Sequence, residues 1–180
     1  MDGEPVSLEV LIVDDSSADL FLTARMFRSL CAPTRIHTAR HGDEALASLR
    51  REGIFAQRPG PGLIVLDLKL PGMTGHELLK VIKEDPGFRS IPVVVLTTSD
   101  DPRERRASLE GGAAAHFVKP NGPRGRAELT AALEAIVLTR EPGRRGPATA
   151  HVGSSRRAPG GGNPSAGAQT RDPGASVPGR

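Results

Sequence analysis

Five short apolar runs, each followed by an amphipathic stretch, constrain the fold of this chain more than any other feature of its sequence. The apolar runs have the length of strands, and the stretches that follow them repeat apolar residues at helical spacing. The strand-like runs span residues 8–15, 35–39, 63–67, 92–98 and 115–119, and the helix-like stretches span residues 17–30, 42–52, 76–84, 102–112 and 125–140. Strands that alternate with helices in this way form a parallel sheet with helices on both faces. The sequence therefore predicts a doubly wound α/β fold.

The character of the chain changes after Arg140. Residues 141–180 contain nine Gly and six Pro, and their only larger aliphatic residues are Val152 and Val177. Such a composition is typical of low-complexity sequence that cannot bury a core. We therefore expect one folded domain over residues 6–140 and a disordered tail over residues 141–180. The tail is expected to be a solvated extension, with weak tethering to an acidic partner as the alternative.

The basic charge of the chain lies in this tail, which carries six Arg against one Glu and one Asp, while residues 1–140 are close to neutral. With no Trp or Tyr either, the folded part lacks the basic face and stacking platforms of a nucleic-acid-binding surface. No apolar run approaches the ~20 residues of a membrane span. The first residues do not resemble a signal peptide, and Cys31 alone cannot form an internal disulfide. These features indicate a cytoplasmic protein that binds neither a specific nucleic acid nor a membrane.

Polar side chains stand at four of the predicted strand ends. Asp14 and Asp15 follow the first strand, Asp67 the third, Thr97 the fourth and Lys119 the fifth. The carboxyl ends of the strands meet at one edge of a doubly wound sheet, where ligands bind. Three carboxylates there would repel one another, by about 4 kcal/mol for two like charges ~4 Å apart at an effective dielectric of roughly 20. A Mg²⁺ ion, which prefers oxygen ligands and leaves positions for phosphate oxygens, resolves that conflict.

This combination of residues suits phosphoryl transfer. Asp67 stands alone at the end of the central apolar strand and is the natural nucleophile, because carboxylates form aspartyl phosphates. Lys119 supplies a fixed cation, and the Thr97 hydroxyl supplies a donor to a phosphoryl oxygen. Taken singly, each of these residues has a simpler explanation as a helix cap, a turn residue or a strand-end hydroxyl. Their joint occurrence at four strand ends is what indicates chemistry.

The sequence resembles the receiver domain of bacterial response regulators from about Val6 to Arg140. Four motifs carry the resemblance: VDD at residues 13–15, LDLKLPGMTG at 66–75, PVVVLTTS at 92–99 and VKP at 118–120. The resemblance implies a five-stranded parallel (βα)5 sheet of the flavodoxin-like type, with strand order 2-1-3-4-5. The stretch REGIFAQRPGPGLIVLDLKLP, with IPVVVLTTS, is similar to a subfamily of stand-alone regulators that partner phytochromes.

The same resemblance implies a phosphorelay site at the strand ends. Asp67 is the implied phosphoacceptor, which receives its phosphoryl group from a histidine kinase or a histidine phosphotransfer protein. Asp14, Asp15, Asp67 and the backbone carbonyl of Lys69 are the implied ligands of Mg²⁺, with Asp15 a direct ligand. The product is a 4-aspartylphosphate.

Further residues are implied to read or to tune the phosphate. Thr97 and Lys119 are expected to sense it. Lys69 and Ser99 stand two residues beyond Asp67 and Thr97, positions that flank the path of the hydrolytic water, and are expected to tune the lifetime of the phosphate. A homodimer through the face formed by the fourth helix, the fifth strand and the fifth helix is also expected at family level.

Three positions depart from the family pattern: His116, Thr74 and Asn121, which stands where an apolar residue is common after the Lys-Pro pair. His116 stands where an aromatic switch residue is usual, three residues before the strand-end lysine. It is expected to act as a smaller switch, to add pH sensitivity near an ordinary pKa of about 6.5, or to face the surface with neither role. Thr74 stands where family members often have Asp.

The fourth helix-like stretch, residues 102–112, is poor in apolar residues. Only Ala107 and Leu109 offer apolar anchors, so we expect a weakly docked helix that can move, with a charged solvated face as the alternative. Motion there would convert one phosphate into a changed protein surface.

Three functions are compatible with these residues. The first is a single-domain response regulator that is not an enzyme, that assists only its own phosphorylation and dephosphorylation, and that signals through changed protein contacts. The second is a phosphatase of the haloacid dehalogenase type, but that family needs an Asp two residues after its nucleophile, where this chain has Lys69. The third is a pseudo-receiver without phosphoryl chemistry, although every residue that the chemistry requires is present. The sequence favours the first function.

Overall fold

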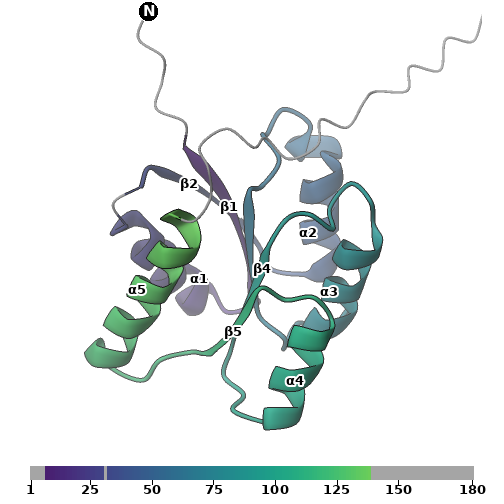
Figure 1. Cartoon of the computed structure of the whole chain (residues 1–180). Helices are drawn as coiled ribbons and strands as arrows, with labels where there is room; N and C mark the ends of the chain where they lie inside the picture. Colours follow the sequence, from purple (N-terminus) through teal and green to yellow (C-terminus); the bar gives the residue numbers. More distant parts are fainter. Residues whose placement is uncertain (1–6, 31, 139–180) are drawn as a thin grey trace, which may run out of the picture. The chain divides into compact units, whose positions relative to one another are not determined.

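The computed structural model describes residues 7–30 and 32–138 of the chain (Figure 1). The chain divides into two units, Met1–Thr149 and Ala150–Arg180, and every described residue belongs to the first. The predicted tail over residues 141–180, Cys31 and both ends of the predicted domain lie outside the described residues.

Within the described residues, five parallel strands form one sheet in the order β2-β1-β3-β4-β5, which confirms the predicted fold and strand order. The strands are β1 (Leu8–Val13), β2 (Thr34–Ala39), β3 (Leu63–Leu66), β4 (Val93–Thr97) and β5 (Ala115–Val118). The strand order reverses at β1, which pairs with β2 on one side and with β3 on the other. Ligands of such sheets bind beyond the carboxyl ends of the strands at this reversal. The fold therefore directs attention to the residues that follow β1 and β3.

Helices cover both faces of the sheet. Helices α1 (Ser17–Arg28) and α5 (Pro123–Leu138) lie on one face, and α2 (Gly42–Arg50), α3 (Gly75–Glu84) and α4 (Pro102–Glu110) lie on the other (Figure 1). A short 3₁₀ helix, η1 (Gly53–Phe55), precedes β3 where the sequence predicted no element. No helix in this part of the chain combines the length and the apolar character that crossing a membrane requires.

Side-chain caps start three of the helices that leave the functional edge of the sheet, α1, α3 and α4. The Ser16 hydroxyl accepts a hydrogen bond from the Asp19 N–H and so caps the start of α1. Thr74 and Glu77 form a reciprocal capping box at the start of α3. The Asp101 carboxylate caps α4. Thr74, which departs from the family pattern, thus has a structural role at a helix start.

Two apolar layers enclose the sheet. Successive residues of β1 point to opposite faces, so Val10 and Ile12 pack toward α1 and α5, while Leu11 and Val13 pack toward α2 and α3. Strands β3 and β4 are buried along their whole length. Burial on both faces explains why these two strands appear in the sequence as uninterrupted apolar runs.

Helix α4 is docked by a polar residue, and the predicted apolar anchors are wrong. Ala107 and Leu109 are both exposed, whereas Ser108 is fully buried. The cause lies in the strand beneath the helix, because His116 of β5 is buried there and its Nδ1 lies 2.8 Å from the Ser108 hydroxyl. Few apolar contacts hold α4, as expected for a weakly docked helix.

Phe27 tests the packing of the layer between the sheet and α1. Its side chain is fully buried, so we expect Phe27→Ala to lower the free energy of unfolding by about 3–5 kcal/mol. Phe21 on the same helix is 61% exposed, and Phe21→Ala is the matched control, with an expected change below about 0.5 kcal/mol. Urea denaturation followed by circular dichroism measures both variants. Equal losses of stability would contradict the described orientation of α1.

Candidate functional site

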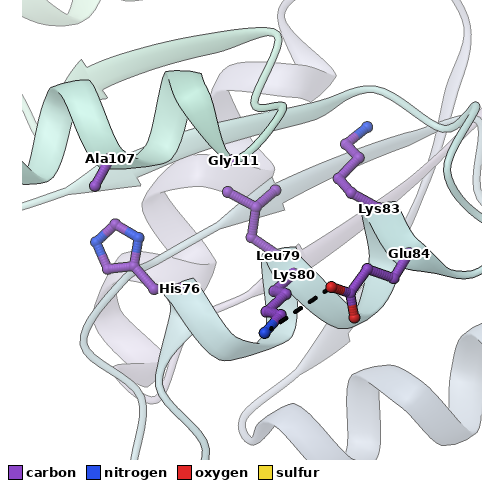
Figure 2. A pocket seen from close by; sticks show the side chains of 7 residues that line it. All are labelled: His76, Leu79, Lys80, Lys83, Glu84, Ala107 and Gly111. Carbon is purple, nitrogen blue, oxygen red and sulfur yellow. Dashed lines mark ion pairs between the residues drawn. The ribbon is translucent and has the colours of Figure 1, made fainter.

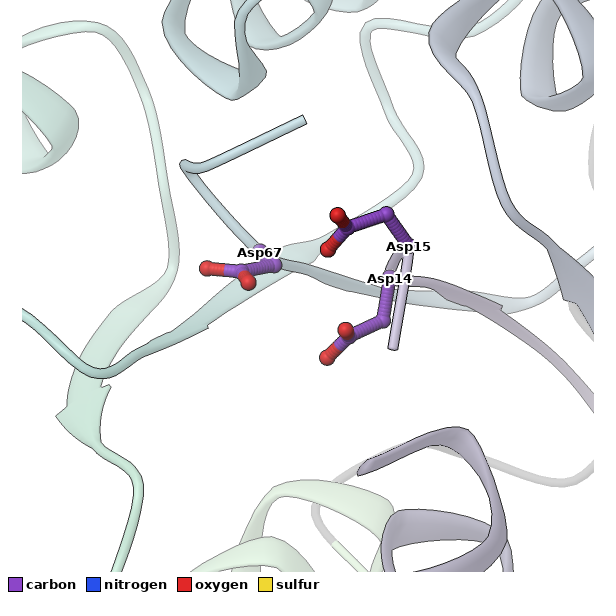
Figure 3. Close-up of side chains that lie close together, drawn as sticks. All are labelled: Asp14, Asp15 and Asp67. Atoms are coloured by element: carbon purple, nitrogen blue, oxygen red, sulfur yellow. The ribbon is translucent and has the colours of Figure 1, made fainter. Parts of the chain in front are cut away.

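Three carboxylates meet at the carboxyl ends of β1 and β3. Asp14 and Asp15 follow β1, Asp67 follows β3, and one oxygen from each lies within 4.8 Å of the others (Figure 3). Backbone hydrogen bonds fix two of these residues, because the Asp14 N–H donates to the Ala39 carbonyl at 3.0 Å and the Asp67 N–H donates to the Val13 carbonyl at 2.9 Å. Asp14 and Asp67 are buried, whereas Asp15 is exposed. The predicted acidic cluster is thus formed, with one member open to solvent.

Lys119 reaches the same cluster from the end of β5. Its backbone N–H donates to the Thr97 carbonyl of β4 at 2.7 Å, which ties the residue to the neighbouring strand. Its Nζ lies 2.7 Å from Asp14 Oδ2 and 3.0 Å from Asp67 Oδ2. Only 13% of the Lys119 side chain is exposed. One ammonium group therefore joins residues that follow three different strands.

Asp19 is a fourth carboxylate of the site, and sequence reasoning missed it. It lies in the first turn of α1, and its Oδ2 accepts a hydrogen bond from Lys119 Nζ at 2.9 Å. The available signal is its position four residues after Asp15, because the first turn of a helix that begins at a strand end stays close to that end. The ammonium group has three N–H donors, so each has a carboxylate partner.

These contacts control the protonation of the site. Burial alone would lower the pKa of Lys119, but its hydrogen bonds to three carboxylates outweigh burial and raise the pKa above its usual value. Burial also raises the pKa of Asp14, and the hydrogen bonds from Lys119 and from the Ser16 N–H oppose that rise. The lysine therefore stays charged at neutral pH and compensates the acids around it.

Backbone donors orient the two buried carboxylates. The Ser16 N–H donates to Asp14 Oδ1 at 3.0 Å, and the Lys69 N–H donates to Asp67 Oδ1 at 3.3 Å. In both residues the other oxygen, Oδ2, contacts the lysine ammonium. Each carboxylate is therefore held by two donors from different parts of the chain, which fixes the direction in which Asp67 presents its oxygens.

Gly75 allows α3 to approach the Asp67 loop closely. Its N–H donates to the Leu68 carbonyl at 3.0 Å. A Cβ atom at residue 75 would collide with the Asp67 carbonyl oxygen and would lie 2.6 Å from the Leu68 Cα. Only glycine fits at this contact between the helix and the loop. Gly75, the last residue of the LDLKLPGMTG motif, thus shapes the site although it carries no side chain.

The acidic cluster fits a hard divalent cation. Its three side chains offer only carboxylate oxygens, the ligands that Mg²⁺ and Mn²⁺ take together with water. The exposed member, Asp15, is the predicted direct ligand and leaves the cluster accessible from solvent. The backbone carbonyl of Lys69 stays a predicted ligand. The donor set therefore agrees with the predicted cofactor class.

Thr97, Ser99 and Lys69 lie at the predicted edge of the sheet. Thr97 is fully buried at the end of β4, and its hydroxyl oxygen accepts a hydrogen bond from the Ser99 N–H at 3.4 Å. Lys69 is exposed two residues after Asp67. Their roles in sensing a phosphate or tuning its lifetime stay predictions.

His116 lies beneath α4 with only 4% of its surface exposed, so the alternative in which it faces the surface is wrong. Its Nδ1 contacts the Ser108 hydroxyl, and its carbonyl oxygen accepts a hydrogen bond from the Arg105 guanidinium at 3.1 Å. Burial lowers the pKa of His116, and the charge of Arg105 lowers it further, against an opposing effect of Glu104 and with a small lowering effect of His76. The inward position agrees with a switch role, which stays a prediction.

Comparison with known proteins places these features in a family. The family model described as response regulator receiver domain matches residues 10–134 of this chain. Response regulator Rcp1 from Synechocystis is 40% identical over 101 residues, which cover 56% of this chain and 69% of Rcp1. The probable methanogenesis regulatory protein FilR2 from Methanothrix harundinacea is 39% identical over 112 residues, which cover 62% of this chain and 71% of FilR2.

Solved structures give the same result. The Mn²⁺-bound form of response regulator Rcp1 superimposes with a TM-score of 0.67 at 32% identity, over 74% of this chain and 96% of that chain. The phosphorylated cyanobacterial phytochrome response regulator RcpA has a TM-score of 0.66 at 32% identity, over 75% of this chain and 97% of that chain. These similarities confirm the predicted resemblance, including the resemblance to regulators associated with phytochromes.

Gly75→Ala tests the close approach of α3 to the Asp67 loop. Because the added Cβ must displace backbone atoms, we expect a loss of about 1–3 kcal/mol in the free energy of unfolding and shifted amide resonances around Asp67. Gly60→Ala is the matched control, because its Cβ would meet nothing within 4 Å. Chemical denaturation and amide NMR spectra measure the two effects. A Gly75→Ala protein as stable as the control would contradict the described contact.

The buried His116 makes stability depend on pH. Because burial lowers its pKa, the unfolded chain takes up a proton at this residue below pH ~6.5 and the folded protein does not. Stability is therefore lost as the pH falls below about 6.5, by at most ~1.4 kcal/mol per pH unit, and the loss ends once the pH is below the folded-state pKa. We expect His116→Phe to lose less stability than the wild type between pH ~7.5 and ~5.5 in thermal or urea denaturation.

The exposed His41 provides the control for this measurement. His41→Ala removes an imidazole that is exposed, for comparison with the removal of the buried one. Parallel stability profiles of the wild type and His116→Phe would show that the buried imidazole does not cause the loss.

Proposed function

The chain belongs to the response regulator receiver family, and from this premise we propose that it accepts a phosphoryl group on Asp67 from a histidine kinase or a histidine phosphotransfer protein. The contact between Lys119 Nζ and Asp67 Oδ2, 3.0 Å long and inside the acidic cluster, carries the proposal. This contact places a buried carboxylate nucleophile beside the Lys119 ammonium, which stabilises a phosphoryl oxyanion. The phosphorylated state of the similar regulator RcpA supports the assignment.

The residues of the site hold the nucleophile in place for transfer. An oxygen of Asp67 attacks the phosphorus of a phosphohistidine, and the bond between phosphorus and the imidazole nitrogen breaks as the bond to oxygen forms. Lys119 then donates a hydrogen bond to a phosphoryl oxygen, and the Thr97 hydroxyl is positioned at the end of the adjacent strand to donate another. Asp15, Asp14, Asp67 and the Lys69 carbonyl would hold Mg²⁺, which neutralises charge on the phosphoryl group when bound. The Mn²⁺-bound form of the similar Rcp1 supports a divalent cation.

We propose that the signal leaves the site through β5 and α4. The Lys119 N–H is bonded to the Thr97 carbonyl, so a movement of either residue toward a phosphoryl oxygen pulls on the end of β5. His116 lies on that strand, and its contacts with Ser108 and Arg105 connect it to α4. A shift of the strand therefore reaches the helix through two polar contacts. The buried imidazole takes the place of an aromatic switch residue in this route.

A groove between α3 and α4 is consistent with movement of α4. Residues of both helices line it, and Figure 2 shows their side chains, including the Lys80–Glu84 ion pair at 3.9 Å. The lining residues are His76, Leu79, Lys80, Lys83, Glu84, Ala107 and Gly111. Because charged and small residues dominate this lining, a shift of α4 breaks little apolar packing.

The proposed output is a changed set of protein contacts around α4 and β5. Leu109 of α4 and Val118 of β5 expose 41% and 45% of their surfaces. These two side chains lie on elements of the face through which the family resemblance implies a protein contact. A homodimer through α4, β5 and α5 is accordingly part of the proposal.

Phosphorylation by acetyl phosphate tests the proposed function. With Mg²⁺ present, we expect the wild-type protein to form an acid-stable, base-labile acyl phosphate, seen by intact mass spectrometry. Asp67→Asn removes the nucleophile and is expected to form none. Asp43→Asn, which removes an exposed acid in the first turn of α2, is expected to react like the wild type. Chelation of Mg²⁺ is expected to stop the reaction in the wild type and in Asp43→Asn.

Other outcomes assign other functions. A wild type that binds neither acetyl phosphate nor beryllofluoride would indicate a pseudo-receiver, and rapid turnover of many phosphomonoesters would indicate a phosphatase. Sedimentation of the beryllofluoride-treated protein reports on the dimer. Sedimentation as a monomer with and without beryllofluoride would reject it.

A further inference from the structure

Asp19 is the one carboxylate on Lys119 that lies outside the four sequence motifs of the family. We propose that Asp19 is a positioning residue of the phosphoryl site: its carboxylate draws the Lys119 ammonium away from the phosphoryl group, and so weakens binding of a phosphoryl oxyanion and strengthens binding of the divalent cation. This inference rests on the proposed function, because it concerns the same site.

The number of donors on Lys119 makes Asp19 a competitor of the phosphoryl group. The ammonium has three N–H bonds, and they face Asp14 at 2.7 Å, Asp19 at 2.9 Å and Asp67 at 3.0 Å. The donor that faces Asp67 passes to an oxygen of the phosphoryl group that Asp67 carries, and the negative charge of that group draws the ammonium toward it and away from Asp14 and Asp19. The loss of one of these two contacts is the step that Asp19 controls.

Burial decides which contact is given up most easily. The side chains of Asp14 and Asp67 are 4% and 5% exposed, whereas that of Asp19 is 32% exposed. A released carboxylate at Asp14 would stay buried without its partner, which is costly. Asp19 can turn to water when the lysine leaves it. Asp19 is therefore the partner that Lys119 exchanges for a phosphoryl oxygen.

The local helix start shows that Asp19 is not needed as a cap. At α3 the corresponding acid, Glu77, bonds back to the N–H of the capping residue Thr74. At α1 the N–H of the capping residue Ser16 is already bonded to Asp14 Oδ1. The carboxylate of Asp19 is thereby left to bond the ammonium instead. The third residue after the capping residue thus completes the cap in α3, as Glu77, and contacts Lys119 in α1, as Asp19.

The charge of Asp19 acts with opposite signs on an anion and a cation. It repels a phosphoryl oxyanion and competes for the ammonium, so its removal strengthens anion binding. It also weakens the hold of Lys119 on Asp14 and Asp67, the carboxylates that a cation needs, so its removal weakens cation binding. A purely structural role of Asp19 would instead weaken both. The opposite signs therefore separate a positioning role from a structural one.

Isothermal titration calorimetry on the full chain measures both affinities. The chain has no Trp or Tyr for fluorescence, so heat is the practical signal. Mg²⁺ is titrated alone, and beryllofluoride is titrated at saturating Mg²⁺. For Asp19→Asn we expect beryllofluoride affinity to rise by roughly threefold to tenfold and Mg²⁺ affinity to fall by about twofold to fivefold. Both differences are expected to shrink in ~1 M salt, because Asp19 is partly exposed.

Asp43→Asn is the matched control, because it also neutralises an acid in the first turn of a helix. Asp19→Asn with beryllofluoride affinity equal to or below that of this control would overturn the inference, as would a parallel fall in both affinities. These results leave the proposed function standing if the wild type binds beryllofluoride and Asp67→Asn does not. A wild type that fails to bind beryllofluoride with Mg²⁺ would reject the proposed function itself.

Discussion

One buried ammonium group compensates the carboxylates that this sheet brings together. Lys119 Nζ lies within 3.0 Å of an oxygen of Asp14, Asp19 and Asp67, and these contacts raise its pKa although burial opposes them. Without that charge, the acids after β1 and β3 would repel one another in a poorly solvated place. The same ammonium is the donor that a phosphoryl group requires. The resting structure of the site and its proposed chemistry therefore depend on one set of contacts.

The sequence predicts the fold and the centre of the site for related physical reasons. Strands buried on both faces appear as uninterrupted apolar runs, so β3 and β4 are visible without any structure. The carboxyl ends of parallel strands gather at one edge, so residues that directly follow a strand, such as Asp14, Asp67 and Lys119, are placed together by topology alone. Once the strands are recognised in the sequence, the residues that directly follow them can therefore be predicted to lie near one another.

The sequence did not predict contacts that depend on the direction in which a helical side chain points. The buried residue of α4 is Ser108, and neither Ala107 nor Leu109 anchors the helix, because the partner beneath it is the imidazole of His116. A search for apolar spacing cannot find a helix that is docked by a hydrogen bond. Asp19 escapes for a similar reason, since its contact with the ammonium depends on a backbone N–H that another residue has already occupied.

The most direct measurement is a crystal structure of the protein with Mg²⁺ and beryllofluoride. We expect beryllium bonded to an oxygen of Asp67, the cation among the carboxylates of the acidic cluster, and Lys119 Nζ within hydrogen-bonding distance of a fluoride and no longer of Asp19. A fluoride adduct remote from Asp67, or a lysine that keeps all three carboxylate contacts in the adduct, would contradict the proposal that Lys119 exchanges a carboxylate partner for the phosphoryl group.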